Sequence, residues 1–244
     1  MLKLPSFSDF NVTRHSAVLS NGVRVTLFER PKTPITIQLG FLSGSRFDPV
    51  GKEGLAHFTE HMVGAGTKKF PTRDIIATFI EGLGGYYNAS TGLDVFNIHT
   101  AVVEAEDFPQ AITLVNEVVN NPLFDTKIIE TERGSILREL ARKESNPGMY
   151  LHVVRRNLFY QGTPSSRATL GSKETIEAIT KEDLIAYYNA MLTSGRAQIT
   201  ISGGISMDEV VKGLESGLVM PKSSRFVISE PLPIIRNKAV EIKK

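Results

Sequence analysis

Two histidines four residues apart, His57 and His61, lie in the segment GLAHFTEHM. Residues at this spacing project from one face of an α-helix, so a helix would bring both imidazoles to a common point. Glu60 lies one turn from His57 and next to His61, and such polar groups are costly to bury on an apolar helix without a partner. The segment therefore predicts a helix over residues 55–63 that ends near Gly64 and carries a metal-binding face. The alternative is a polar helix face with solvent-exposed histidines.

The order His-x-x-Glu-His is the inverted form of a known zinc motif. A catalytic zinc site needs three protein ligands and an open fourth position. Because the chain contains no cysteine, the third ligand has to be a histidine, an aspartate or a glutamate. His15, His99 and His152 each stand alone in the sequence, and we interpret them as structural or surface residues. The motif thus predicts a zinc site with two histidine ligands and a nearby glutamate that is free for another role.

A second acidic pattern lies on a long helix that we predict over about residues 126–144. Glu132 and Glu139 are seven residues apart there, which is nearly two turns, so both side chains face the same way. Either carboxylate could reach a metal ion. A solvated face paired with Arg138 and Arg142 fits the same spacing, and spacing alone leaves both interpretations open.

The composition bounds the class of protein. The chain has 244 residues with a formal net charge of +2, so its bulk charge indicates neither a nucleic-acid partner nor an anionic membrane. No apolar run approaches the roughly 18 residues that span a bilayer, and the first residues lack the apolar core of a secretory signal. We therefore expect a protein of the cytoplasm, or of an organelle if a transit peptide has been removed.

The pattern of apolar residues predicts an α+β fold. Asn21-Gly22 is a strong hairpin signal between two β-rich runs. The strands are predicted at residues 15–19, 23–28, 35–42, 86–90, 95–103 and 199–202. The helices are predicted at residues 55–63, 72–83, 108–119, 126–144, 149–159, 173–178 and 181–191. The strands come mostly before the helices, and hairpins join neighbouring strands. This order favours a mainly antiparallel sheet packed with helices over a doubly wound parallel sheet.

These segments together resemble the N-terminal half of the pitrilysin-type (M16) metallopeptidases, over nearly the whole chain. Residues 21–25 (NGVRV) look like the family's opening hairpin, and residues 44–46 with 54–62 and 66–67 look like its zinc segment. Residues 84–91 (GGYYNAST) are similar to its substrate-binding edge strand. Residues 132–139 (ERGSILRE) match its second acidic motif.

The resemblance implies a mechanism and a role for each site residue. Glu139 would be the third ligand of a Zn²⁺ ion beside His57 and His61. Glu60 and Glu132 would be the catalytic residues. Glu60 would accept a proton from the attacking water and later pass it to the leaving amine. Glu132 would orient a ligand or tune the local field.

The resemblance also implies how a peptide substrate is held. The strand around Asn88, Ala89 and Ser90 would bind an extended peptide by adding it to the sheet as a further strand. A plain edge strand with no such role is the alternative for these residue types.

The family's complete unit has two related halves, and the second supplies an Arg/Tyr pair that holds the substrate. We assign none of these roles to the present chain. We expect residues 1–219 to form the zinc-binding peptidase domain and residues 220–244 to form a connector toward a second half. The short alternating run at residues 239–242 would be either the first strand beyond that connector or the last strand of the same sheet. The second half could belong to the same chain or to a partner in a homo- or heterodimer.

Three functions fit these patterns. The first is a zinc endopeptidase domain that acts on unfolded or extended peptides and is weakly active or inactive without its second half. The second is a zinc-retaining, non-catalytic subunit that binds peptides or supports assembly, although the intact Glu60 argues against it. The third is a zinc hydrolase of small amides or esters.

Overall fold

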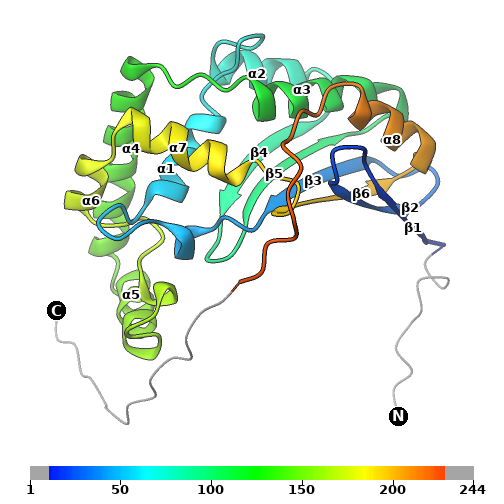
Figure 1. The fold of residues 1–244 in the computed structure, drawn as a ribbon. Helices are drawn as coiled ribbons and strands as arrows, with labels where there is room; N and C mark the ends of the chain where they lie inside the picture. Colours follow the sequence, from blue (N-terminus) through cyan, green and yellow to red (C-terminus); the bar gives the residue numbers. More distant parts are fainter. Residues whose placement is uncertain (1–10, 229–244) are drawn as a thin grey trace.

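The computed structural model describes residues 11–228 as one six-stranded sheet with helices over one face and beyond one end (Figure 1). The strand order is β1-β2-β6-β3-β5-β4. The strands are β1 (Thr13–Val18), β2 (Arg24–Glu29), β3 (Ile35–Phe41), β4 (Tyr86–Thr91), β5 (Phe96–Val102) and β6 (Ala197–Gly203). The helices are α1 (Leu55–Val63), α2 (Arg73–Glu81), α3 (Phe108–Asn120), α4 (Thr126–Ser145), α5 (Pro147–Phe159), α6 (Lys173–Ala178), α7 (Lys181–Met191) and α8 (Met207–Glu215).

The predicted α+β class is confirmed, with one departure in the sheet. All strand pairs are antiparallel except β2 with β6, which run parallel. Strand β6 follows the helices in the sequence and inserts between β2 and β3, so its direction is not set by a hairpin. The sheet is therefore mixed, although its antiparallel pairs predominate as expected.

The hairpin at Asn21-Gly22 joins β1 to β2 as the sequence predicts. Gly22 has a φ of +88°, a conformation that L-residues with a side chain adopt at a cost. The side-chain oxygen of Asn21 accepts a hydrogen bond from the backbone N–H of Val23 at 3.1 Å. The turn chemistry thus fixes the register in which Val18 lies opposite Arg24.

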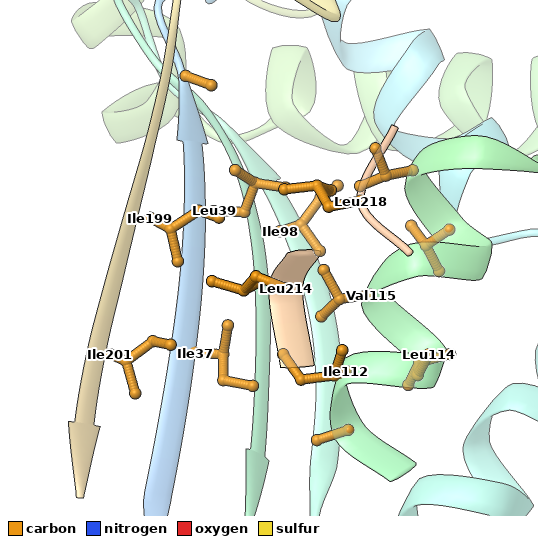
Figure 2. Packing of buried hydrophobic residues seen from close by; sticks show 14 of the residues in the cluster. Ile37, Leu39, Ile98, Ile112, Leu114, Val115, Ile199, Ile201, Leu214 and Leu218 are labelled. Carbon is orange, nitrogen blue, oxygen red and sulfur yellow. The ribbon is translucent and has the colours of Figure 1, made fainter. Parts of the chain in front are cut away.

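The main core lies between the sheet and the helices α2, α3 and α8, which cover one face (Figure 1). Alternate residues of β3, β5 and β6 are fully buried, as expected for strands with one covered face. Figure 2 shows their side chains meeting those of α3 and α8. The labelled contributors are Ile37, Leu39, Ile98, Ile112, Leu114, Val115, Ile199, Ile201, Leu214 and Leu218. Each such side chain contributes about 1.5–3 kcal/mol through its removal from water.

A second apolar cluster holds α1 against the helices α4, α6 and α7 at one end of the sheet. Phe58 and Met62 of α1 are fully buried in it, together with Ile136 of α4. Arg133 of α4 stacks over the ring of Phe58 at 5.2 Å and donates hydrogen bonds to carbonyl groups at the end of α6. The two helices that carry the predicted ligands are thereby locked side by side.

Residues 220–228 form no helix or strand but follow the surface of the domain. The backbone N–H of Phe226 donates to the carbonyl of Gly195 at 2.9 Å, and Arg196 lies 3.5 Å from the centre of the Phe226 ring. The alternating run at residues 239–242 lies outside the described residues, and the division at residue 219 stays a prediction. Within residues 11–228, no helix combines the length and the apolar character needed to cross a bilayer.

Candidate metal centre

A buried carboxylate fixes the start of α1. Gly54 precedes the helix with a φ of +96°. It has no side chain that could cap the first free N–H groups of the helix. The carboxylate of Asp48 accepts the N–H of Gly54 at 2.8 Å and that of Ala56 at 2.9 Å. Asp48 is only 2% exposed, and this burial raises its pKa to about 7. The N-terminal turn, and with it His57, is therefore held from outside the helix.

His57 and His61 project from the same face of α1 toward α4. Their rings are 4.8 Å apart between centroids, and His57 is 8% exposed. One carboxylate oxygen of Glu139 lies 3.1 Å from Nε2 of His57 and 3.9 Å from Nε2 of His61. One donor atom from each of the three residues lies within 4.8 Å of the others. The predicted ligands thus converge although Glu139 lies 82 residues after His57.

Glu60 takes a different position from the three converging residues. One of its carboxylate oxygens lies 3.5 Å from Nδ1 of His57, on the side of that ring away from Glu139. The side chain also lines a cavity of about 210 Å³ together with His61. Glu60 is therefore close to the cluster, yet free to contact a molecule in the cavity.

Glu132 contacts the ring nitrogen of His61 that does not face Glu139. One of its oxygens lies 2.7 Å from Nδ1 of His61, and the other lies 3.0 Å from a guanidinium nitrogen of Arg73. A carboxylate at Nδ1 keeps the proton on that nitrogen and leaves Nε2 of the neutral ring free to bind a metal. Lys143 makes a comparable contact to Glu139, at 3.0 Å from its second oxygen.

The ion pairs within the cluster shift the pKa values of its members. Burial acts to lower the pKa of His57, but the hydrogen bonds to Glu139 and Glu60 outweigh it and raise that pKa to about 9. The hydrogen bond from His57, helped by Lys143, lowers the pKa of Glu139 to about 2. The hydrogen bond from His61 lowers the pKa of Glu132. A proton on His57 and the charge of Lys143 thus offset the carboxylates in the metal-free protein.

This donor set fits a zinc ion. Two imidazole nitrogens and one carboxylate oxygen are ligands that zinc accepts, and three protein ligands leave a position open. The second nitrogen of each histidine faces a carboxylate, of Glu60 for His57 and of Glu132 for His61, as is usual for metal-binding histidines.

The cavity beside the cluster reaches the edge of the sheet. Asn88 and Ala89 of β4 line it opposite Glu60 and His61. β4 is the last strand of the sheet, so one side of its backbone has no neighbouring strand among the described residues. Ser90 is not among the lining residues; its hydroxyl lies 3.1 Å from Nε2 of His99 on β5. The structure therefore joins two of the three predicted substrate contacts to the metal cluster.

Several residues of the site escape sequence reasoning. Arg73 contacts Glu132 only because distant segments fold together, whereas Asp48 caps α1 from six residues before Gly54 and Lys143 contacts Glu139 from the next turn of the same helix. The spacing of Lys143 from Glu139, four residues along one helix, was the one signal that could have identified a partner.

An α+β domain that presents a His-His-Glu cluster beside an open strand edge has the features of a metallopeptidase domain. The family model described as insulinase (peptidase family M16) matches residues 24–173, and the chain belongs to this family.

The similar curated proteins are much longer than the part that matches this chain. The mitochondrial-processing peptidase subunit beta of Bos taurus is 33% identical over 198 residues, which cover 80% of this chain and 39% of that protein. An uncharacterized zinc protease of Rickettsia felis is 28% identical over 90% of this chain and 53% of that protein. The chain therefore spans about half or less of the length of these relatives.

Solved structures confirm the fold. Pitrilysin superimposes with a TM-score of 0.80 at 25% identity, over 93% of this chain and 25% of that chain. A structure described as a peptidase M16 inactive domain from Pseudomonas fluorescens superimposes with a TM-score of 0.82 at 22% identity. The match covers 91% of this chain and 54% of that chain. The same fold therefore occurs in a relative described as inactive, so the fold alone does not establish catalysis.

Proposed function

We propose that this chain is a zinc-dependent endopeptidase domain that hydrolyses extended peptides. The observation that carries the proposal is the convergence of His57, His61 and Glu139 while Glu60 stays beside them in a cavity. Zinc held by the three ligands would polarise the scissile carbonyl and lower the pKa of bound water toward ~7.

The chain's own residues supply the remaining steps. Glu60 accepts the proton of the attacking water on its carboxylate and passes it to the nitrogen of the leaving amine. Glu132 fixes the ring of His61, and Arg73 fixes Glu132. The open edge of β4 aligns the substrate backbone, and Asn88 and Ala89 lie where that strand meets the cavity.

Glu60→Gln tests this proposal. The variant keeps its shape and all three ligands, so we expect unchanged zinc stoichiometry and a loss of peptide hydrolysis of at least ~100-fold. Glu81→Gln is the matched control because Glu81 lines the same cavity without contacting the histidines. Undiminished turnover in the Glu60 variant would rule out Glu60 as the base. The assay uses unstructured peptides beside small amides and esters, and faster cleavage of the small compounds would favour the third function considered above.

We also propose that full activity needs a second homologous half, which would supply an Arg/Tyr pair. The chain covers 39% to 53% of the relatives described above, and 25% to 54% of the two longer solved chains that share its fold. If that half belongs to a partner chain, the assembly is a dimer. Hydrolysis should then rise when the second half is added to this domain.

A zinc-retaining, non-catalytic subunit is the second candidate. The similarity to a structure described as an inactive domain is the observation that favours it. Peptide binding without cleavage, measured with the second half present, would support this function over catalysis.

A further inference from the structure

A second cavity, of about 740 Å³, lies between the C-terminal part of α4 and α5. Helices α4 and α5 and the turn at residues 168–171 form it. Its lining is mainly apolar and includes Leu140, Met149, Val153 and Leu170. The volume is within the range of ordinary ligand-binding sites, roughly 300–1,000 Å³.

The apolar surface continues beyond this cavity along α5. No residue of α5 is buried, and the helix projects from the body of the domain (Figure 1). Leu151 is 60% exposed and Phe159 is 67% exposed, and Leu151 lies outside the cavity lining. A large exposed apolar surface of this kind marks an interaction site. Since the surface is wider than the cavity, a polypeptide matches it better than a small molecule.

The charged side chains that line the cavity indicate which ionic group the bound polypeptide would carry. Nε of Arg156 is buried and has no hydrogen-bond acceptor in the described part of the chain. Among the residues that the structure describes, the guanidinium donates only to the hydroxyl of Thr169, at 3.2 Å, and burial lowers its pKa. Within residues 11–228, no carboxylate lies within ion-pair distance of Arg156. A desolvated guanidinium without a counter-ion is costly, and a carboxylate placed in the cavity would remove this cost.

Two further cations reinforce this preference. Lys143 and Arg155 also line the cavity, against one acidic residue, Glu144. Because Lys143 is paired with Glu139 of the metal cluster, the two arginines against Glu144 leave a positive excess beside an apolar wall. The complement is an apolar peptide segment that bears an aspartate, a glutamate or a terminal carboxylate.

We propose that the cavity between α4 and α5 is a docking site for an acidic, apolar segment of another polypeptide, with its carboxylate paired to Arg156. Among the described residues Arg156 contacts Thr169 and no member of the metal cluster, so a substitution of Arg156 should leave that cluster intact; Lys143, which also lines the cavity, is the residue that borders both sites.

A charge-swap binding experiment tests this. The full chain carrying Glu60→Gln is titrated, with chelator present, into a labelled hexapeptide of alternating leucine, glutamate and phenylalanine, and into its glutamine counterpart. Fluorescence anisotropy should show at least ten-fold tighter binding of the glutamate peptide. Arg156→Met should abolish that preference. Arg142→Met, an exposed substitution on α4 outside the cavity lining, should preserve it. Equal affinity for both peptides, or an equal effect of both substitutions, would overturn the proposal.

Thermal unfolding separates a binding arginine from a structural one. A guanidinium kept without a counter-ion destabilises the free domain, so Arg156→Met should melt at the same temperature as the parent or higher. A clear fall in melting temperature would instead identify Arg156 as structural and overturn the proposal. Dodecanoate serves as a small-molecule probe. If dodecanoate binds through Arg156 while the glutamate peptide does not, the occupant is a small amphiphile and the polypeptide proposal is wrong.

Discussion

Nδ1 of His61 lies 2.7 Å from a carboxylate oxygen of Glu132, which comes 71 residues later on another helix. This contact fixes the ring so that its other nitrogen faces Glu139. We expect Glu132→Gln to weaken zinc binding by roughly 10- to 100-fold, because such outer contacts orient the ligand and raise its basicity. Competition with a chromogenic chelator measures the affinity. Glu130→Gln, an exposed change on the same helix, should leave it unaltered.

Glu139→Gln should have a larger effect than Glu132→Gln, because it removes a ligand instead of a support. The amide cannot replace the anionic oxygen that lies near both Nε2 atoms. We expect zinc content after dialysis to fall well below one ion per chain, as measured by atomic absorption. Wild-type stoichiometry and affinity would show that Glu139 is not the third ligand.

The ion pair between His57 and Glu139 should make the stability of the metal-free protein depend on pH. The folded pKa of His57, about 9, is above its ordinary 6.5, so its contribution is complete below pH 6.5 and is lost as the pH rises toward 9. The folded pKa of Glu139, about 2, is below its ordinary 4.5, so its contribution is present above pH 4.5 and is lost toward pH 2. Urea unfolding in chelator should therefore show the largest stability difference between wild type and His57→Gln between about pH 4.5 and 6.5. A difference that stays constant from pH 3 to 9 would contradict this expectation.

Asp48 should contribute a pH slope of the same sign as that of His57 and of the opposite sign to that of Glu139. Its folded pKa of about 7 exceeds its ordinary 3.8, so the folded state holds the proton more tightly and stability falls as the pH rises between these values. Asp48→Asn should remove this component. The free energy of unfolding of the variant, taken relative to that of wild type, should therefore increase as the pH is raised from about 4 to about 7.5. Urea titrations at each pH measure it. Asp208→Asn, an exposed control in the first turn of α8, should show no comparable trend.

Gly54→Ala should be far more harmful than Gly51→Ala, although both glycines have a positive φ. A Cβ at Gly51 would meet no atom within 4 Å, so only the backbone conformation is penalised, by ~1 kcal/mol. A Cβ at Gly54 would come within 2.6 Å of the carbonyl oxygen of Leu170 as well. We expect a further loss of about 2 kcal/mol or more in the free energy of unfolding, and weaker zinc binding because α1 shifts. Comparable urea midpoints for the two variants would contradict this.

Local sequence signals predicted the elements that carry the site. Helix α1 occupies residues 55–63 as expected, because its apolar face and the glycines at its ends act within one segment. Thr72, the first residue of the helix predicted at residues 72–83, caps α2 and accepts the N–H of Ile75 at 3.3 Å. Capping boxes, which a local sequence pattern specifies, also form at Thr180 and Ser206.

Long-range contacts set the limit of these predictions. The parallel pairing of β6 with β2 joins segments more than 160 residues apart, and no turn chemistry specifies it. Spacing alone left Glu139 as either a ligand or part of a solvated face, and the family resemblance favoured a ligand. The structure places it beside both histidines because Phe58 and Ile136 pack α1 onto α4. Arg73 reaches Glu132 in the same way, through packing that no local pattern encodes.

The position of β4 at the edge of the sheet has a cost for the isolated domain (Figure 1). Edge strands commonly carry charged residues or proline, which prevent unintended pairing with other chains. β4 has the sequence YYNAST and carries neither, and Tyr86 is half exposed. An edge that can accept any extended backbone does not distinguish a substrate from a partly unfolded copy of the same chain. The domain by itself should therefore tend to aggregate through β4 at high concentration, and extended peptides that occupy this edge should keep it in solution.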